Sequence, residues 1–72
     1  MKKYDEAINF YSKAIEINPN CSEYYLGKGF CLHNIERCVE AISIYKKAAE
    51  IDSDDPMIFN NIGCAYLKVS HL

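Results

Sequence analysis

The sequence predicts an all-α fold, a short array of four antiparallel helices in a single domain. Three observations predict it. The chain repeats itself at a 34-residue interval, its apolar residues recur at helical spacing, and its composition disfavours strands. Thr is absent and Val occurs only twice, whereas Ala, Glu, Lys, Ile and Tyr are frequent. Each repeated unit is therefore predicted to be a pair of helices.

The repeat is seen when the sequence is aligned with itself after a shift of 34 residues. Nine of the 38 overlapping positions are then identical, whereas chance gives roughly two or three. The identical pairs are Glu6/Glu40, Ala7/Ala41, Ile8/Ile42, Tyr11/Tyr45, Lys13/Lys47, Ala14/Ala48, Glu16/Glu50, Ile17/Ile51 and Gly29/Gly63. Conservative pairs such as Tyr25/Phe59 extend the match.

The first two helices are predicted on either side of a proline loop. In the first, the residues at helical spacing are Ala7, Tyr11, Ala14 and Ile15, with Ile8 and Ile17 on a flanking stripe. This helix ends at Asn18-Pro19-Asn20, because the residue before a proline is pushed out of helical geometry. Ser22 is the predicted N-cap of the second helix. That helix carries Tyr25, Gly29 and Leu32 on one face and runs to about Asn34.

The third and fourth helices repeat this arrangement after a short turn at residues 35–37. The third, about 38–51, carries Ala41, Tyr45, Ala48 and Ala49 on the face that matches the first helix. Residues 52–55 form the next loop. Asp55 is a predicted cap and Pro56 the first helical residue. The fourth helix, about 56–70, carries the apolar or small residues Phe59, Ile62, Gly63, Tyr66 and Leu67.

Small residues are predicted to set the distance between neighbouring helices. Alanines at 7, 14, 41 and 48 permit a close approach, and Tyr11 and Tyr45 fill the remaining gap. Gly29 and Gly63 lie inside helices, where glycine costs up to about 1 kcal/mol against alanine. Because both units have glycine at this position, we expect a contact there that excludes a side chain.

Composition excludes several classes of protein. Net charge is −2 with no basic excess, so the electrostatic signature of a nucleic-acid binder is missing. No apolar run approaches the roughly 18 residues of a membrane-spanning helix, and the charged N-terminal segment does not resemble a secretion signal. Four cysteines occur without a C-x-x-C pair. We therefore expect reduced thiols in an intracellular, cytoplasmic protein that binds neither nucleic acid nor membrane.

Taken together, these residues resemble the tetratricopeptide repeat family over nearly the whole chain. The carriers are Tyr25, Gly29, Leu32, Glu40-Ala41-Ile42, Tyr45, Ala48, Ile51, Phe59, Ile62-Gly63 and Tyr66, preceded by a half unit with Tyr4-Asp5-Glu6-Ala7-Ile8, Tyr11, Ala14 and Ile17-Asn18-Pro19-Asn20. Two positions depart from the family pattern: Lys28 stands where leucine is usual, and Ser53 replaces the loop proline. On this resemblance, residues 1–21 hold the second helix of one unit, 22–55 a complete unit, and 56–72 the first helix of another.

The resemblance implies a right-handed superhelix whose concave groove binds peptides or partner helices, and a scaffold in place of an enzyme. The family lines this groove with the first helix of each unit. The matching positions here are Glu23, Leu26, Gly27, Phe30, His33, Asn34, Met57, Asn60, Asn61, Cys64, Leu67 and Lys68. This set mixes apolar and amide groups with little positive charge, which favours an apolar or amide-rich partner segment.

One subset of the family grips the C-terminal carboxylate of heat-shock chaperones with lysine, asparagine and arginine. This chain has Leu26, Phe30, Met57 and Asn61 at the corresponding places. Only an asparagine matches, so chaperone-tail binding is not expected. The structural alternative is that Leu26, Phe30 and Met57 are buried by packing or by a larger array.

No catalytic, cofactor or metal site is predicted. The cysteines and His33 and His71 fit no ligand spacing, and cysteine often behaves as a small buried hydrophobe. Cys64, beside the groove, is the one thiol whose reactivity we would test. The acidic loop around Asp52 is not a calcium loop, because its sixth and twelfth places hold Met57 and Gly63.

The sequence begins with the second helix of one unit and ends with the first helix of another. Each end helix therefore lacks its partner and is predicted to expose a face. Residues 56–72 followed by 4–21 would complete a unit. We therefore expect a homo-oligomer, either a closed dimer or a head-to-tail stack. The function predicted is a scaffold that binds a protein or peptide in its groove and self-associates through its end helices. The alternative is a structural piece of a longer array with no ligand of its own.

Overall fold

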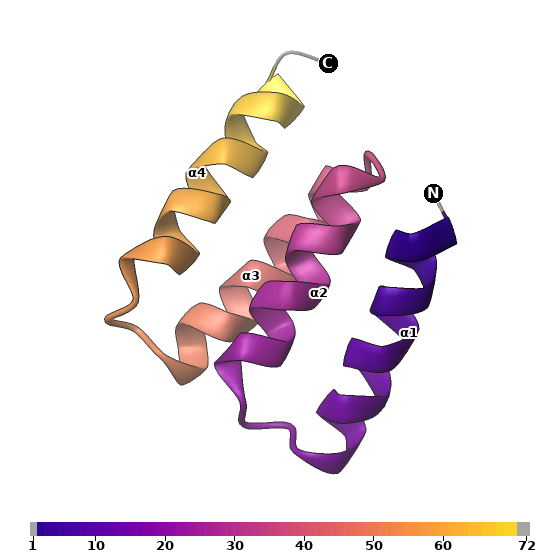
Figure 1. Ribbon diagram of the computed structural model, residues 1–72. Helices are drawn as coiled ribbons and strands as arrows, with labels where there is room; N and C mark the ends of the chain where they lie inside the picture. The colour runs from indigo at the N-terminus through magenta and orange to yellow at the C-terminus, as the bar shows by residue number, and fades with distance from the viewer. Residues whose placement is uncertain (1, 71–72) are drawn as a thin grey trace.

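Residues 2–70 are described in a computed structural model, and they form four consecutive helices (Figure 1). Helix α1 spans Lys2–Ile17, α2 spans Ser22–Asn34, α3 spans Cys38–Ile51, and α4 spans Pro56–Ser70. These bounds confirm the all-α fold and the order of helices and loops that the repeat predicts. None of the described helices has both the length and the apolar character needed to cross a membrane.

Each helix packs on the next one along the chain. In Figure 1, α2 and α3 cross the middle of the molecule with α3 behind α2, while α1 and α4 flank them. Helix α4 packs on α3 and meets α2 at a few positions only, and α1 makes its close backbone contacts with α2. The arrangement places α1 and α4 on opposite sides of the central pair.

The core lies where α3 meets α2 and α4. One cluster of buried residues contains Leu32, Ala41, Ile42, Tyr45 and Ala65. A second cluster contains Tyr25, Ala48 and Ile58. Tyr45 and Ile58 are the largest fully buried side chains. The alanines and the tyrosine of the predicted α3 face therefore form the centre of the molecule.

The loop between α3 and α4 ends in the predicted cap. The backbone N–H of Met57 donates to the Asp55 carboxylate at 3.0 Å, and α4 begins at Pro56. At the start of α2 the prediction was wrong. Ser22 is already the first helical residue, and Cys21 occupies the cap position without a side-chain hydrogen bond.

Two further contacts fix the remaining loops. The Tyr25 hydroxyl donates to the Pro19 carbonyl oxygen at 3.0 Å, which ties the first loop to α2. In the turn after α2, Glu36 has φ of 70°, a left-handed conformation that residues with a Cβ rarely adopt. The Arg37 N–H donates to the Leu32 carbonyl oxygen at 2.9 Å across this turn, so the sharp reversal lets α3 return along α2.

The apolar residues of α4 are distributed differently from those of α2. Ile58 and Ala65 are buried against α3, whereas Phe59, Tyr66 and Leu67 are exposed. Tyr25, the counterpart of Phe59 in α2, is buried in a cluster with Ala48 of α3. No described residue covers the corresponding side of α4, which is why its side chains stay open.

The expected glycine contact is present at one of the two positions. A Cβ at Gly29 would lie 2.6 Å from the ring of Tyr45, so this glycine lets α2 and α3 approach closely. A Cβ at Gly63 would meet no atom within 4 Å. The expectation fails at Gly63 because no described residue supplies the aromatic ring that Tyr45 supplies to Gly29.

Candidate functional site

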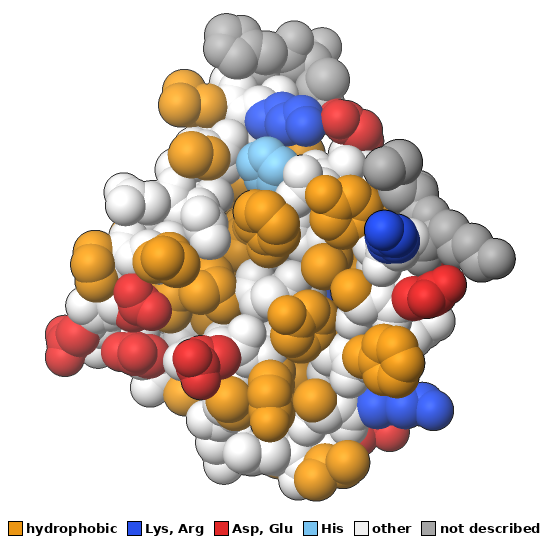
Figure 2. Space-filling view, in the orientation of Figure 1, with side chains coloured by type: hydrophobic (Ala, Val, Ile, Leu, Met, Phe, Trp, Pro, Cys, Tyr) orange, Lys and Arg blue, Asp and Glu red, His pale blue; other side chains and the backbone are white. Residues whose placement is uncertain are grey.

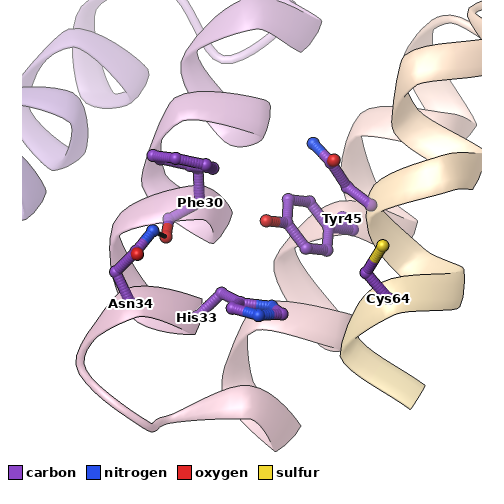
Figure 3. Close-up of a pocket in the computed structure, with 6 residues that line it drawn as sticks. Phe30, His33, Asn34, Tyr45 and Cys64 are labelled. Atoms are coloured by element: carbon purple, nitrogen blue, oxygen red, sulfur yellow. Dashed lines mark hydrogen bonds between the residues drawn. The ribbon is translucent and has the colours of Figure 1, made fainter. Parts of the chain in front are cut away.

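A hollow opens between α2 and α4, on the side of the molecule away from most of α3. Its volume is about 250 Å³. Figure 3 shows Phe30, His33 and Asn34 on one side of it, Cys64 on the other, and Tyr45 between them. The residues that line it are Phe30, His33, Asn34, Tyr45, Asn61 and Cys64.

A second hollow of about 390 Å³ continues the first one toward α1. Both are lined by Phe30 and Asn61, so the two form one surface, which we call the α2–α4 groove. The other residues lining the second hollow are Tyr11, Glu23, Leu26, Gly27, Cys31 and Met57. Figure 2 shows hydrophobic side chains gathered over the middle of this face, with acidic ones near the α3–α4 loop.

Tyr45 gives the groove a polar group in an apolar setting. Tyr45 is only 1% exposed, yet its hydroxyl points toward the hollow (Figure 3). Burial is the main cause that raises the pKa of Tyr45 to about 12, and the neighbouring Cys31, Cys64 and Cys38 contribute to the same rise. The phenol therefore stays protonated near neutral pH and is available as a hydrogen-bond donor.

The walls of the groove are mainly apolar. Phe30 is 53% exposed and Met57 is 59% exposed. Leu26 is half-buried and packs against both core clusters, so it belongs as much to the core as to the groove. The Asn34 amide donates to the Phe30 carbonyl oxygen at 2.8 Å, which fixes this side chain beside the aromatic ring.

The structure brings together most of the residues that the sequence places in a groove. Nine of the twelve predicted groove positions line the two hollows: Glu23, Leu26, Gly27, Phe30, His33, Asn34, Met57, Asn61 and Cys64. Asn60, Leu67 and Lys68 line neither. The ammonium of Lys68 instead pairs with the carboxylate of Glu36 at 3.0 Å, which links α4 to the turn after α2.

Three lining residues were missed by the sequence analysis: Tyr11, Cys31 and Tyr45. The family resemblance assigns the groove to the first helix of each unit, whereas Tyr11 and Tyr45 belong to α1 and α3. A signal was available, because a tyrosine paired with a glycine reaches across the helix pair. Gly27 is likewise in contact with α1, since a Cβ there would lie 2.3 Å from the Tyr11 ring.

The thiols differ in their access to solvent. All four cysteines are free; Cys31 and Cys38 are buried and Cys64 is exposed. Burial raises the pKa of the Cys31 thiol, which keeps it protonated. Cys64 is thus the accessible thiol of the groove. His71, the other histidine considered in the sequence, lies outside the described residues.

Parts of the chain match protein-family profiles, and nearly the whole chain is similar to known proteins. Residues 1–21 match one family profile and residues 22–55 match another, both described as Tetratricopeptide repeat. The chain is similar to the Small glutamine-rich tetratricopeptide repeat-containing protein 2 of Mycosarcoma maydis, with 34% identity over 97% of the chain. It is also similar to a UDP-N-acetylglucosamine--peptide N-acetylglucosaminyltransferase of Giardia intestinalis, with 34% identity over 93% of the chain.

A third similar protein is the Protein O-mannosyl-transferase TMTC3 of Mus musculus, with 25% identity over 93% of the chain. The chain spans only 18%, 4% and 7% of the lengths of these three relatives, respectively. The similarity therefore concerns the helical repeat and not the complete relatives.

Proposed function

Because the chain belongs to the tetratricopeptide repeat family, whose repeats generally mediate protein–protein interactions, we propose that it binds a protein segment in the α2–α4 groove. The observation that carries the proposal is the pair of large apolar side chains, Phe30 and Met57, left half-exposed in a concave surface. Exposed apolar surface of this kind is typical of sites that receive a partner. The family is generally a non-catalytic scaffold, and the proposal assigns the chain no reaction.

The chemistry of the groove favours an apolar or amide-rich segment. Among the residues that line it in the described chain, Glu23 is the only carboxylate, and no lysine or arginine is present. A carboxylate of the partner would therefore lose water without gaining an opposite charge. An apolar side chain would pack on Phe30, while the Tyr45 hydroxyl and the Asn61 amide supply hydrogen bonds to a backbone or amide group.

A random peptide library displayed on phage, selected against the chain, tests this proposal. A selected peptide carrying a fluorophore is then titrated with the wild type and with Phe30→Asp, and binding is followed by anisotropy. We expect the substitution to raise the dissociation constant roughly tenfold or more, as truncating a central anchor does. Selected sequences should be rich in apolar and amide side chains.

The matched control is Val39→Asp, because Val39 is also apolar and 71% exposed but lies on α3 and does not line the groove. It should leave the dissociation constant unchanged. Equal weakening by both variants, or by neither, would place binding elsewhere. Leu26→Asp is unsuitable as a test, since Leu26 also packs against the core.

The second part of the proposal is self-association through α1 and α4. It is supported by the exposed side chains Phe59 and Tyr66 on α4 and by Phe10 and Ile17 on α1, which are 73% and 86% exposed. The competing function is a structural one, in which residues 1–72 are part of a longer array and bind no ligand of their own. That alternative predicts that library selection yields no peptide sensitive to Phe30→Asp.

A further inference from the structure

The contact between α2 and α3 is a template for a second contact in the same sequence. Its centre is the ring of Tyr45 against Gly29, where an added Cβ would come within 2.6 Å of the ring. About one helical turn before and after Tyr45 in the sequence of α3, Ala41 and Ala48 are fully buried. The small residues let the two backbones approach, and the tyrosine fills the space that the glycine leaves.

Helix α4 has the counterparts of the residues that α2 contributes to this contact, but on α4 they are uncovered. Gly63 is the repeat counterpart of Gly29, and a Cβ there would meet nothing within 4 Å. The residues that flank Gly63 are also more exposed than their counterparts that flank Gly29. Phe59 is 51% exposed where Tyr25 is 7% exposed, and Tyr66 is 46% exposed where Leu32 is 2% exposed. This face, which we call the Gly63 face, consists of Phe59, Gly63 and Tyr66.

Helix α1 has the residues that α3 contributes to the contact with α2. Ala7, Tyr11 and Ala14 are identical to Ala41, Tyr45 and Ala48 of α3, and all three are only partly buried. The Tyr11 ring rests against Gly27 of α2, on one side of α1 only. In the template, by contrast, α3 is covered by α2 on one side and by α4 on the other.

The two halves cannot meet within one molecule. Helices α1 and α4 lie on opposite sides of the α2–α3 pair (Figure 1), and they make no close backbone contact. A second copy of the chain removes this obstacle, because its α1 is a separate body with the required residues in the required order.

We propose that the Gly63 face of one copy packs against α1 of a second copy, antiparallel, with the Tyr11 ring on Gly63 as the Tyr45 ring lies on Gly29. The inference rests on the self-association part of the proposed function and adds its geometry. Unlike faces meet in this contact, so the second copy keeps its own Gly63 face free for a third. Assembly by such a heterologous contact continues beyond the dimer unless the rotation closes a ring.

Gly63→Ala is the decisive variant, because it separates assembly from folding. The added methyl group meets open space in the single chain and improves helix propensity, so folding is unharmed. In the proposed contact the same methyl group would strike the Tyr11 ring. Tyr66→Glu is a second variant, which places a charge at the edge of the Gly63 face. Asn60→Ala is the matched control on α4, since Asn60 is exposed and does not belong to that face.

Light scattering over about a hundredfold range of protein concentration measures the outcome, with circular dichroism as the test of folding. For the wild type we expect a mass that rises with concentration from the 8.3 kDa of the single chain past that of a dimer. Gly63→Ala should raise the apparent dissociation constant roughly tenfold or more, as expected for an overpacked interface. Asn60→Ala should assemble as the wild type does.

Each other result overturns the proposal in a distinguishable way. A wild type that stays at 8.3 kDa throughout means that a second copy is not the occupant of the Gly63 face. A Gly63→Ala chain that assembles like the wild type means that self-association uses another surface. Neither result affects peptide binding in the α2–α4 groove, which is measured separately with Phe30→Asp.

Discussion

Alanine substitutions at the three glycines test whether the helix packing is as described. The structure gives each glycine a different neighbour. A Cβ at Gly29 would lie 2.6 Å from the Tyr45 ring, a Cβ at Gly27 would lie 2.3 Å from the Tyr11 ring, and a Cβ at Gly63 would meet nothing. All three positions lie inside helices, so the gain in helix propensity, about 0.5–1 kcal/mol, is common to them.

The differences in stability therefore isolate the steric cost. Tyr45 is part of the buried core cluster with Leu32, Ala41 and Ile42, which limits how far its ring can move, and overpacking typically costs about 1–3 kcal/mol. Gly63→Ala should raise the free energy of unfolding by about 0.5–1 kcal/mol, and Gly29→Ala should lie about 1–3 kcal/mol below it. Gly27→Ala should fall between the two, because Tyr11 is partly exposed and its ring has room to rotate.

Urea unfolding followed by circular dichroism measures this order. Dilute protein is required, because self-association adds stability that depends on concentration. Comparing the variants at equal m-values ensures that the native and unfolded states are the same in all of them. If Gly29→Ala and Gly63→Ala changed stability equally, the close contact between Tyr45 and Gly29 would be wrong, and the template for the second contact would be lost with it.

Three further predictions concern stability. Ile58→Ala should lower the free energy of unfolding by about 2–5 kcal/mol in urea titrations, because Ile58 is fully buried; a loss below about 0.5 kcal/mol, the size of an ordinary surface effect, would contradict its placement. Glu36→Gly should have a free energy of unfolding about 0.5–1 kcal/mol above that of Glu36→Ala, because both variants lose the pair with Lys68 and only glycine relieves the left-handed backbone; equal stability of the two variants would contradict the positive φ. Because the pKa of Tyr45 rises from 10.0 to about 12 on folding, the wild type should lose stability between pH 10 and 12. The unfolded state releases the proton first, so Tyr45→Phe should reduce this loss; an identical alkaline titration of both proteins would contradict the burial of the hydroxyl.

Most of the fold follows from local signals in the sequence. The 34-residue repeat, Pro19 and the Asp55-Pro56 pair predict where the helices begin and end, because proline geometry and capping act within a few residues. Ser22 was predicted to be the N-cap of α2 but is its first helical residue. The prediction was one position off because serine is acceptable both at the cap and in the first turn. The order of helices and loops and the Asp55 cap were predictable, whereas the cap of α2 was not.

The site was predicted less completely, for reasons of tertiary geometry. Positions on α2 and α4 were assigned to a groove from the resemblance to the tetratricopeptide repeat family, which matches Phe30 and Asn61 to groove positions. Tyr45 reaches the groove from α3 because Gly29 leaves its path open. The recurring tyrosine and glycine indicate a contact between two helices, but the sequence does not indicate that the tyrosine hydroxyl opens into the groove. Lys68 was assigned to the groove by the same resemblance, yet its long side chain reaches Glu36 instead.

Whether the α2–α4 groove receives a protein segment is tested most directly by the labelling rate of Cys64. Cys64 is the exposed thiol of the groove, and Cys21, half-buried at the start of α2, provides an internal reference outside it. Alkylation by N-ethylmaleimide, resolved by mass spectrometry, is measured in Gly63→Ala chains with and without a saturating selected peptide. We expect the peptide to slow the labelling of Cys64 and to leave that of Cys21 unchanged. Unchanged labelling of Cys64, while anisotropy shows the peptide bound, would contradict binding in the groove.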